Sequence, residues 1–325
     1  MKKRLFIFIF FLCISVVRGI AQLSPQFSQY MEVPSAINPA SIARDEMMSV
    51  FGVYRLQWAG YSGAPKDMMF SFTMPLKIGD TKHGLGLYFF SDEIGLFKNQ
   101  SVLLQYSYKL RVLKGVLSLG LNVGFINQTF DKDEVDFVGA GGEEMSGDEY
   151  HESDDPILKE FTASESNDVA FDVSFGCEYS QDEFYVGLSV LHLNAARFNY
   201  GSDVYELYMP RIFSLTGAYE LQTHKSDLIF IPSAQLRTNF SSWQCELTGL
   251  FEYSKRVRGG ISYRFGDAFV FLFGVDIING LRLCYSYDLP TSKMIRSGGS
   301  HEVSLRYSFK PQFAKKNKYK SDRIL

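Results

Sequence analysis

Alternation of apolar and polar residues, repeated in segment after segment, is the feature of this sequence that most limits its fold. In 115–125, Leu117, Leu119 and Leu121 alternate with Ser, Gly and Asn, and 168–179 repeats the pattern. A period of two places successive side chains on opposite faces of a β-strand. Fourteen such segments follow one another: 47–54, 67–74, 84–92, 100–109, 115–125, 168–179, 184–191, 211–221, 227–238, 243–253, 257–265, 268–277, 280–287 and 301–309.

These segments predict an all-β fold, specifically a transmembrane antiparallel β-barrel of about 14 strands over residues 47–309. Many of them have the length of about 9 to 11 residues that a tilted membrane strand needs, and their number is even. Charged residues share one face of the strands, and we expect that face to line a polar lumen. They are Asp172, Glu178, Glu246, Glu252, Arg264, Arg282 and Arg306. With both signs present, we expect ion pairs across a blocked or narrow lumen. A soluble β-sandwich with one solvated face is the alternative.

Composition agrees with strands that have two opposite faces. The chain has 29 Phe, 19 Tyr and 2 Trp, yet its mean hydropathy is −0.06. Outside the N-terminus no run approaches the roughly 20 apolar residues of a membrane helix, which excludes a polytopic helical protein. The net charge of −3 gives no sign of nucleic-acid binding.

The connections between the predicted strands also differ by side, as barrels of this class require. If the first strand runs outward, the periplasmic connections are all short. The outer set contains the four longest, 55–66, 126–167, 192–210 and 288–300.

Residues 1–21 have the pattern of a cleaved signal peptide. Lys2, Lys3 and Arg4 precede an apolar run over 5–17 and then a small residue, Ala21. We therefore expect an exported protein of the bacterial outer membrane whose mature chain begins at residue 22. Lipidation at Cys13 is the alternative, but bulky residues precede that cysteine. The remaining Cys177, Cys245 and Cys284 do not form a disulfide framework.

The two ends of the mature chain are not predicted to be strands. Residues 22–46 contain Pro25, Pro34 and Pro39, and we hypothesise that this polar segment plugs the lumen. Residues 310–325 form a basic tail that would lie in the periplasm, either as a solvated terminus or as a contact to an acidic partner or peptidoglycan.

Five strings in a fixed order resemble one known family. They are PQFSQY (25–30), AINPA (36–40), YRLQWAGYSGAP (54–65), YSYD (285–288) and GSHEVSLRYSF (299–309). Together they resemble the PorP/SprF family, outer-membrane proteins of the type IX secretion system of Bacteroidetes. The strings supply the candidate partner or structural residues Gln26, Phe27, Gln29, Tyr30, Asn38, Pro39, Tyr54, Arg55, Gln57, Trp58, Gly60, Gly63, Pro65, His301 and Glu302.

The resemblance implies a barrel that supports secretion or surface attachment of cargo such as adhesins, in a system linked to gliding motility. The partners implied are outer-membrane lipid, the periplasmic ring, the translocon and cargo proteins, with a peptidoglycan-associated lipoprotein as a further candidate and no nucleic acid. The alternative function is a channel or transporter for small or hydrophobic solutes, because a barrel fold does not fix function.

No segment of the sequence predicts catalysis or a cofactor. HExxH, GxSxG, Walker and CxxC motifs are all missing, and His301 and Glu302 are adjacent, so a strand points them to opposite faces. In 127–167, acidic residues outnumber basic ones thirteen to two. Their spacing does not follow a calcium-binding loop, which favours a solvated surface loop over a metal site.

Overall fold

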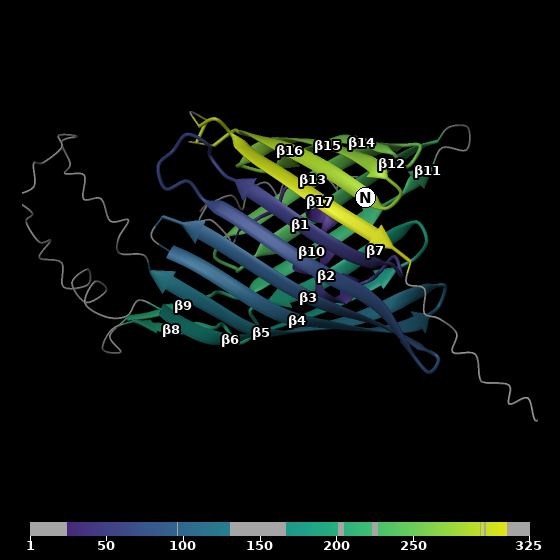
Figure 1. The fold of residues 1–325 in the computed structure, drawn as a ribbon, viewed down its shortest axis with the longest axis horizontal. Coiled ribbons are helices and arrows are strands. Elements are labelled where there is room, and N and C mark those ends of the chain that lie inside the picture. The colour runs from purple at the N-terminus through teal and green to yellow at the C-terminus, as the bar shows by residue number, and fades with distance from the viewer. Residues whose placement is uncertain are drawn as a thin grey trace, which may run out of the picture.

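The fold is one antiparallel sheet closed on itself. The computed structural model describes residues 25–95, 97–130, 167–200, 205–222, 227–292, 294–295 and 297–310; the signal-peptide region, most of the acidic connection and most of the basic tail lie outside these. Fourteen strands follow one another around the sheet, which closes because β1 pairs with β17 and β10 pairs with β12 (Figure 1). The predicted β-barrel is therefore confirmed.

The barrel strands are β1 (Met48–Leu56), β2 (Lys66–Ile78), β3 (Thr81–Ile94), β4 (Phe97–Val112), β5 (Gly115–Phe130), β6 (Asn167–Ser180), β7 (Phe184–Leu191), β10 (Ile212–Tyr219), β12 (Leu228–Thr238), β13 (Trp243–Tyr253), β14 (Val257–Arg264), β15 (Ala268–Ile278), β16 (Leu281–Pro290) and β17 (Ser300–Phe309). The short strand β11 (Leu221–Gln222) pairs with β12 in the same sheet. Outside the barrel wall are β8 (Arg197–Tyr200), β9 (Tyr205–Tyr208) and the 3₁₀ turns η1 (Tyr30–Glu32), η2 (Pro34–Ala36) and η3 (Pro39–Ser41).

Alternation along the strands separates an apolar outer face from an inner face that is mostly polar, although β1 and β15 also turn apolar side chains inward. In β15, Phe269, Phe271 and Phe273 point outward and are each about half exposed. In β6, Asp172 and Glu178 point inward and are at most 1% exposed. This arrangement reverses that of a soluble protein and suits a wall with lipid outside and charge inside. In the described part of the chain, no helix has the length and apolar character needed to cross a membrane.

The two ends of the barrel differ. At one end, which we call the turn end, the connections are short: 79–80, 113–114, 181–183 and 279–280. Strand β1 begins and β17 ends at this end. At the other, the loop end, lie the longer connections 57–65 and 291–299. Several strands continue beyond the predicted apolar runs. For example, β4 begins at Phe97 rather than residue 100, because polar residues there keep pairing with β5 through the backbone.

The connection 192–210, predicted as a loop, contains a hairpin of β8 and β9 (Figure 1). The pairing of β6 with β7 reaches only to Phe175, so the loop-end half of β6 extends past its neighbour. Phe198 of the hairpin packs there against Ile126 and Ala170 of β5 and β6. The hairpin thereby buries apolar side chains of the wall that the shorter β7 leaves uncovered.

Candidate functional site: the occupied lumen

Residues 25–46, which we call the lumen segment, lie inside the barrel. The prolines at 34 and 39 begin 3₁₀ turns and supply no N–H for a strand ladder, so this part of the chain forms short turns instead of a fifteenth strand. Its side chains and backbone form hydrogen bonds with residues of β4, β6, β7, β12, β13, β14, β16 and β17, which together line much of the lumen.

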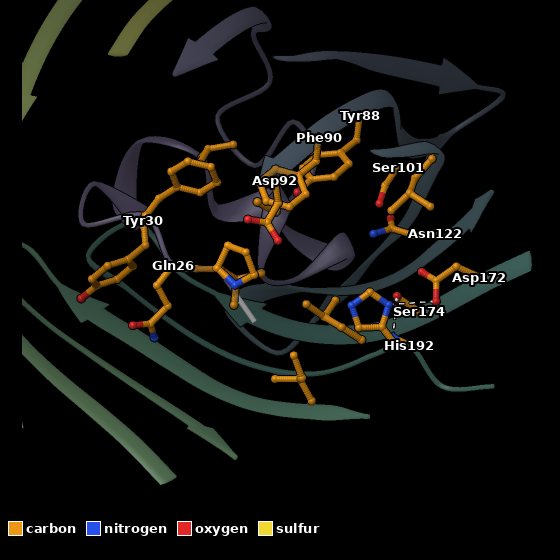
Figure 2. A pocket seen from close by; sticks show the side chains of 18 of the residues that line it. Gln26, Tyr30, Tyr88, Phe90, Asp92, Ser101, Asn122, Asp172, Ser174 and His192 are labelled. Carbon is orange, nitrogen blue, oxygen red and sulfur yellow. Dashed lines mark hydrogen bonds and ion pairs between the residues drawn. The ribbon is translucent and has the colours of Figure 1, made fainter. Parts of the chain in front are cut away.

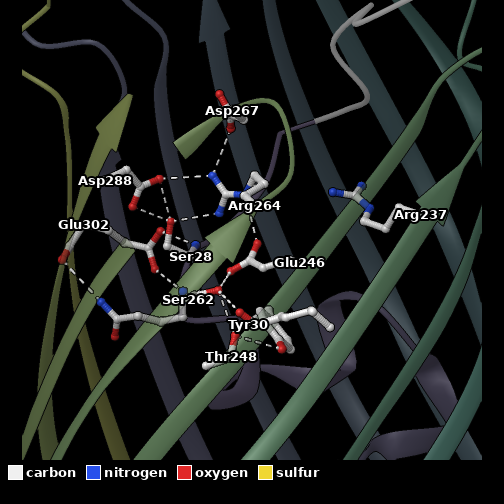
Figure 3. Close-up of polar contacts among 12 residues, drawn as sticks. Ser28, Tyr30, Arg237, Glu246, Thr248, Ser262, Arg264, Asp267, Asp288 and Glu302 are labelled. Atoms are coloured by element: carbon white, nitrogen blue, oxygen red, sulfur yellow. Dashed lines mark hydrogen bonds and ion pairs between the residues drawn. The ribbon is translucent and has the colours of Figure 1, made fainter. Parts of the chain in front are cut away.

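One anchor of the lumen segment is a group of buried charges near the loop end, the loop-end cluster, made of Arg55, Arg264, Asp288, Glu302 and Glu246 (Figure 3). Arg55 donates to Asp288 at 2.7 Å and to Glu302 at 3.2 Å. Arg264 donates to Glu246 at 2.9 Å and to Asp288 at 3.1 Å. All five side chains are at most 2% exposed, so each charge depends on its partners rather than on water.

Ser28 of the lumen segment occupies the centre of the loop-end cluster. Its hydroxyl donates to Asp288 at 2.7 Å and accepts from Arg55 at 2.8 Å and Arg264 at 3.1 Å. Its backbone N–H and that of Gln29 each donate to one oxygen of Glu302, at 2.8 and 2.9 Å. The segment therefore completes the hydrogen bonding of carboxylates that would otherwise be buried with too few donors.

A second anchor, the turn-end cluster, surrounds Glu32. Its carboxylate lies 2.9 Å from Arg258, 3.5 Å from Arg282 and 3.9 Å from Arg306. Arg306 also binds Asp45 at 2.9 Å. Burial alone would raise the pKa of Glu32, but the three guanidinium groups outweigh burial and hold the pKa below its ordinary value.

The middle of the lumen segment lies in a groove made by glycines. Gly120, Gly176 and Gly187 come from β5, β6 and β7, and a Cβ at any of them would lie within 3.0 Å of atoms of residues 38–40. Asn38 uses this closeness to donate to the Cys177 carbonyl at 3.0 Å. These strand glycines are therefore required by the close approach of another backbone, as glycines within strands often are.

Beside this groove, the segment pairs with a predicted lumen charge. Arg44 forms a two-pronged ion pair with Glu178, at 2.6 and 2.5 Å, and lies 3.7 Å over the ring of Tyr185. Further along the lumen, the hydroxyl of Tyr30 bonds Ser233 at 2.8 Å and Thr248 at 3.2 Å. Burial raises the pKa of Tyr30, so this hydroxyl stays neutral.

The structure brings only part of the predicted set together. Eight of these residues lie in the lumen: Gln26, Phe27, Gln29, Tyr30, Asn38, Pro39, Arg55 and Glu302. The prediction that Arg55 belongs to the first outer connection was wrong, because β1 extends to Leu56 and points Arg55 into the lumen. Tyr54 points outward and is half exposed, and His301 bonds the hydroxyl of Tyr285 on the outer face, at 2.8 Å.

The other motif residues, Gln57, Trp58, Gly60, Gly63 and Pro65, form the first loop-end connection. That connection is tied to the last one. Ala59 exchanges backbone hydrogen bonds with residues 298 and 299 at 2.8 Å each, and the N–H of Trp58 donates to Ser300 at 3.1 Å. Gly60 and Gly63 have positive φ, which fits their place in a tight loop.

The seven predicted lumen charges all face inward, but their partners are closer than expected. Glu246 and Glu252 lie directly opposite Arg264 and Arg258 on the adjacent strand. Arg282 pairs with Asp276, and Asp172 pairs with His192. Glu178 and Arg306 pair with Arg44 and Asp45 of the lumen segment. Ion pairs that cross the open lumen, as the sequence predicted, are not formed by these residues, because the lumen segment occupies the space between the opposite walls.

Several contributors to this site were not singled out from the sequence: Glu32, Arg44, Asp288, Gly120, Gly176 and Gly187. Ser28 and Asp288 stand inside two of the strings noted above, and glycine at the inward position of a long strand is itself a sign of close backbone approach. Within the described residues, no group of three or more His, Cys, Asp or Glu side chains is placed to hold a metal ion.

An apolar outer wall and a charged lumen occupied by the chain's own N-terminal segment define an integral outer-membrane β-barrel. Within that class, the chain belongs to the PorP/SprF family of type IX secretion system membrane proteins, whose sequence profile matches residues 19–307. The match includes the whole lumen segment and nearly all of the barrel.

Solved structures that match this chain at low similarity include the following three. A FadL homologue of Pseudomonas aeruginosa is 12% identical with a TM-score of 0.48, over 84% of this chain and 92% of that one. The Pseudomonas putida toluene transporter TodX is 12% identical with a TM-score of 0.46, over 86% and 94%. Omp33 of Acinetobacter baumannii is 6% identical with a TM-score of 0.45, over 81% and 97%. Likeness this weak says nothing about what the chain binds. Comparison with curated proteins finds no match.

Proposed function

We propose that this protein supports the secretion or surface attachment of type IX cargo, such as adhesins, as a structural and interaction component rather than as the conduit. The observation that carries the proposal is the occupied lumen. A polypeptide crossing the barrel would have to displace the lumen segment from both ion clusters. Breaking a buried ion pair by removing one partner costs about 3–5 kcal/mol, and the segment takes part in several such contacts.

The turn end offers the surface for partners in this proposal. A cavity of about 920 Å³ opens there between the lumen segment and the turns. Its rim carries both signs of charge, with Arg44 and Asp45 from the segment and Lys114 and Asp182 from two turns. A periplasmic ring component is the proposed occupant. The basic residues that follow Lys310 would lie on the same side, where a peptidoglycan-associated lipoprotein is the proposed contact.

A deletion strain tests the proposal. We expect loss of surface adhesins or secreted proteins, with solute uptake unchanged, and restoration by the wild-type gene. Normal secretion combined with a nutrient-uptake defect would overturn the proposal and support the channel alternative.

A second strain, complemented with a chain that lacks residues 22–40, separates the roles of the wall and the segment. We expect this strain to assemble the barrel and to become more permeable to small solutes. Unchanged permeability would show that the segment does not close the lumen. Sequencing the N-terminus of the wild-type protein would test the proposed cleavage before residue 22.

A further inference from the structure

A second, smaller cavity lies between the lumen segment and the loop-end half of the wall (Figure 2). Its volume is about 100 Å³. Phe27 of the segment and Tyr88 and Phe90 of β3 supply aromatic surface, and His192 and Met209 line it from the connection that carries the β8–β9 hairpin. We call it the loop-end cavity. An apolar cavity of about 150 Å³ can hold a molecule as large as benzene, and this smaller cavity adds charged and polar side chains to its apolar lining.

Arg237 of β12 lines the loop-end cavity without the partners that the other buried arginines have. Arg55 and Arg264 are each paired with two or more carboxylates. Arg237 is 6% exposed, and its only hydrogen bond to a described residue is a long one of 3.5 Å, to the carbonyl of Pro25. Figure 3 shows it apart from the cluster. Its Nε has no protein acceptor among the described residues. A buried guanidinium with so few hydrogen-bond partners is stabilised when it binds an anion.

Acceptor oxygens in the same cavity lack donors. Asp92 and Asp172 are at most 2% exposed, and each has one carboxylate oxygen with no donor among the described residues. The side-chain oxygens of Gln105 and Asn122, which also line the cavity, likewise have no hydrogen-bond donor among the described residues. Asp92 also lies directly opposite Asp67 in the β2–β3 ladder, and the two carboxyl groups hydrogen-bond each other, so one of them carries a proton and Asp92 remains available as an acceptor.

We propose that the loop-end cavity binds a small zwitterion, a free α-amino acid with an apolar side chain no larger than that of valine. Its carboxylate would bind Arg237, its ammonium group would bind Asp92, and its side chain would contact Phe27 and Phe90. A dianion would be repelled by the carboxylates, and a simple cation would leave the arginine without a partner. A zwitterion is neutral overall and satisfies both groups, which suits a site of low dielectric.

The test uses the purified full-length protein in detergent, with L-valine as the probe and isothermal titration calorimetry as the readout. Two matched compounds each lack one charge: 3-methylbutanoate has no ammonium group, and 2-methylpropan-1-amine has no carboxylate. We expect L-valine to bind and each of the other two to bind at least about tenfold more weakly, since a hydrogen bond to a buried charge is lost. No binding of L-valine at millimolar concentrations would overturn the proposal. Equal binding of 3-methylbutanoate would also overturn it, by showing an anion site only.

Variants locate the site. Arg237→Gln and Asp92→Asn should each weaken L-valine binding by about tenfold or more. Arg256→Gln is the matched control, because Arg256 is an exposed arginine in a turn-end connection, and it should bind as the wild type does. Heat-dependent mobility on SDS gels verifies that each barrel is folded. Wild-type affinity in folded Arg237→Gln would overturn the assignment. If that variant does not fold, the comparison of the three compounds on the wild type decides. Because the readout is binding to the purified protein, it is independent of the secretion experiments.

Discussion

Replacing Gly120 with alanine should loosen the lumen segment while leaving the barrel intact. The added Cβ would lie less than 3.0 Å from the backbone of Pro39 and Ala40, against an ordinary contact distance of 3.4–4 Å. Neither neighbour is the end of a flexible side chain, so residues 38–40 must move away from the wall. Gly259→Ala is the matched control, because a Cβ at this strand glycine meets nothing within 4 Å.

The size of the effect follows from what the movement breaks. Overpacking of a tight interior typically costs about 1–3 kcal/mol. Moving Asn38 away also removes its bond to the Cys177 carbonyl, which adds about 0.5–1.5 kcal/mol. A total of about 2–4 kcal/mol corresponds to a rise of roughly thirty- to a thousandfold in the population of undocked segment, since each 1.4 kcal/mol is a factor of ten.

Hydrogen–deuterium exchange of the purified protein measures this population directly. In the wild type, the N–H groups of Ala40 and Ser41 are bonded to Asn38 and should exchange slowly. In Gly120→Ala their protection should fall by the factor given above, while the barrel strands keep theirs. Equal protection in Gly120→Ala and Gly259→Ala would refute the reasoning, because it would mean that the segment does not depend on the glycine groove.

Three further predictions concern the anchors of the lumen segment. Arg55→Met should lower barrel stability by about 3–5 kcal/mol, seen as a lower temperature for the mobility shift on SDS gels, with Arg256→Met unchanged; intact stability with lost secretion would instead indicate a partner contact. Glu32 has a depressed pKa. Its ionised carboxylate therefore stabilises the docked lumen segment fully above the ordinary glutamate pKa near 4.3, and this stabilisation is lost as the pH falls through the lower pKa of the folded state. Bilayer conductance of the wild type should therefore rise only at pH values below the ordinary pKa of a glutamate, whereas Glu32→Gln should conduct more at neutral pH and lack that rise. Gly299→Ala, at φ +79° and crowded by Tyr287, should destabilise the loop end by about 1–3 kcal/mol, seen as faster exchange at Ala59; unchanged exchange would contradict it.

The barrel itself was predictable because its strands lie between lipid and a polar lumen, and these two environments produce the alternation of apolar and polar residues. Lipid outside and charge inside require alternation along every strand, so the fourteen strands and the inward positions of charges such as Glu178 and Arg282 follow from the order of residues alone. The β8–β9 hairpin was not predictable, because strands of four residues are too short to show a period.

The contacts of the lumen segment lie beyond what periodicity can show. Ser28 and Asp288 are 260 positions apart, and nothing in the local sequence says that they meet. Arg55 was misplaced for a related reason. A charged residue next to Gln57 and Trp58 resembles a loop, and only the buried carboxylates of β16 and β17 make the inward position of Arg55 stable.

The place of the lumen segment in the chain links filling of the barrel to its closure. The segment immediately precedes β1, the first strand, yet Ser28 near its start bonds Asp288 and Glu302 of the last two. The same Glu302 binds Arg55 across the seam where β1 meets β17. The first residues of the folded chain thus have no complete binding site until the final strand is in place. Docking of the lumen segment can therefore be completed only when β16 and β17 are in place beside β1.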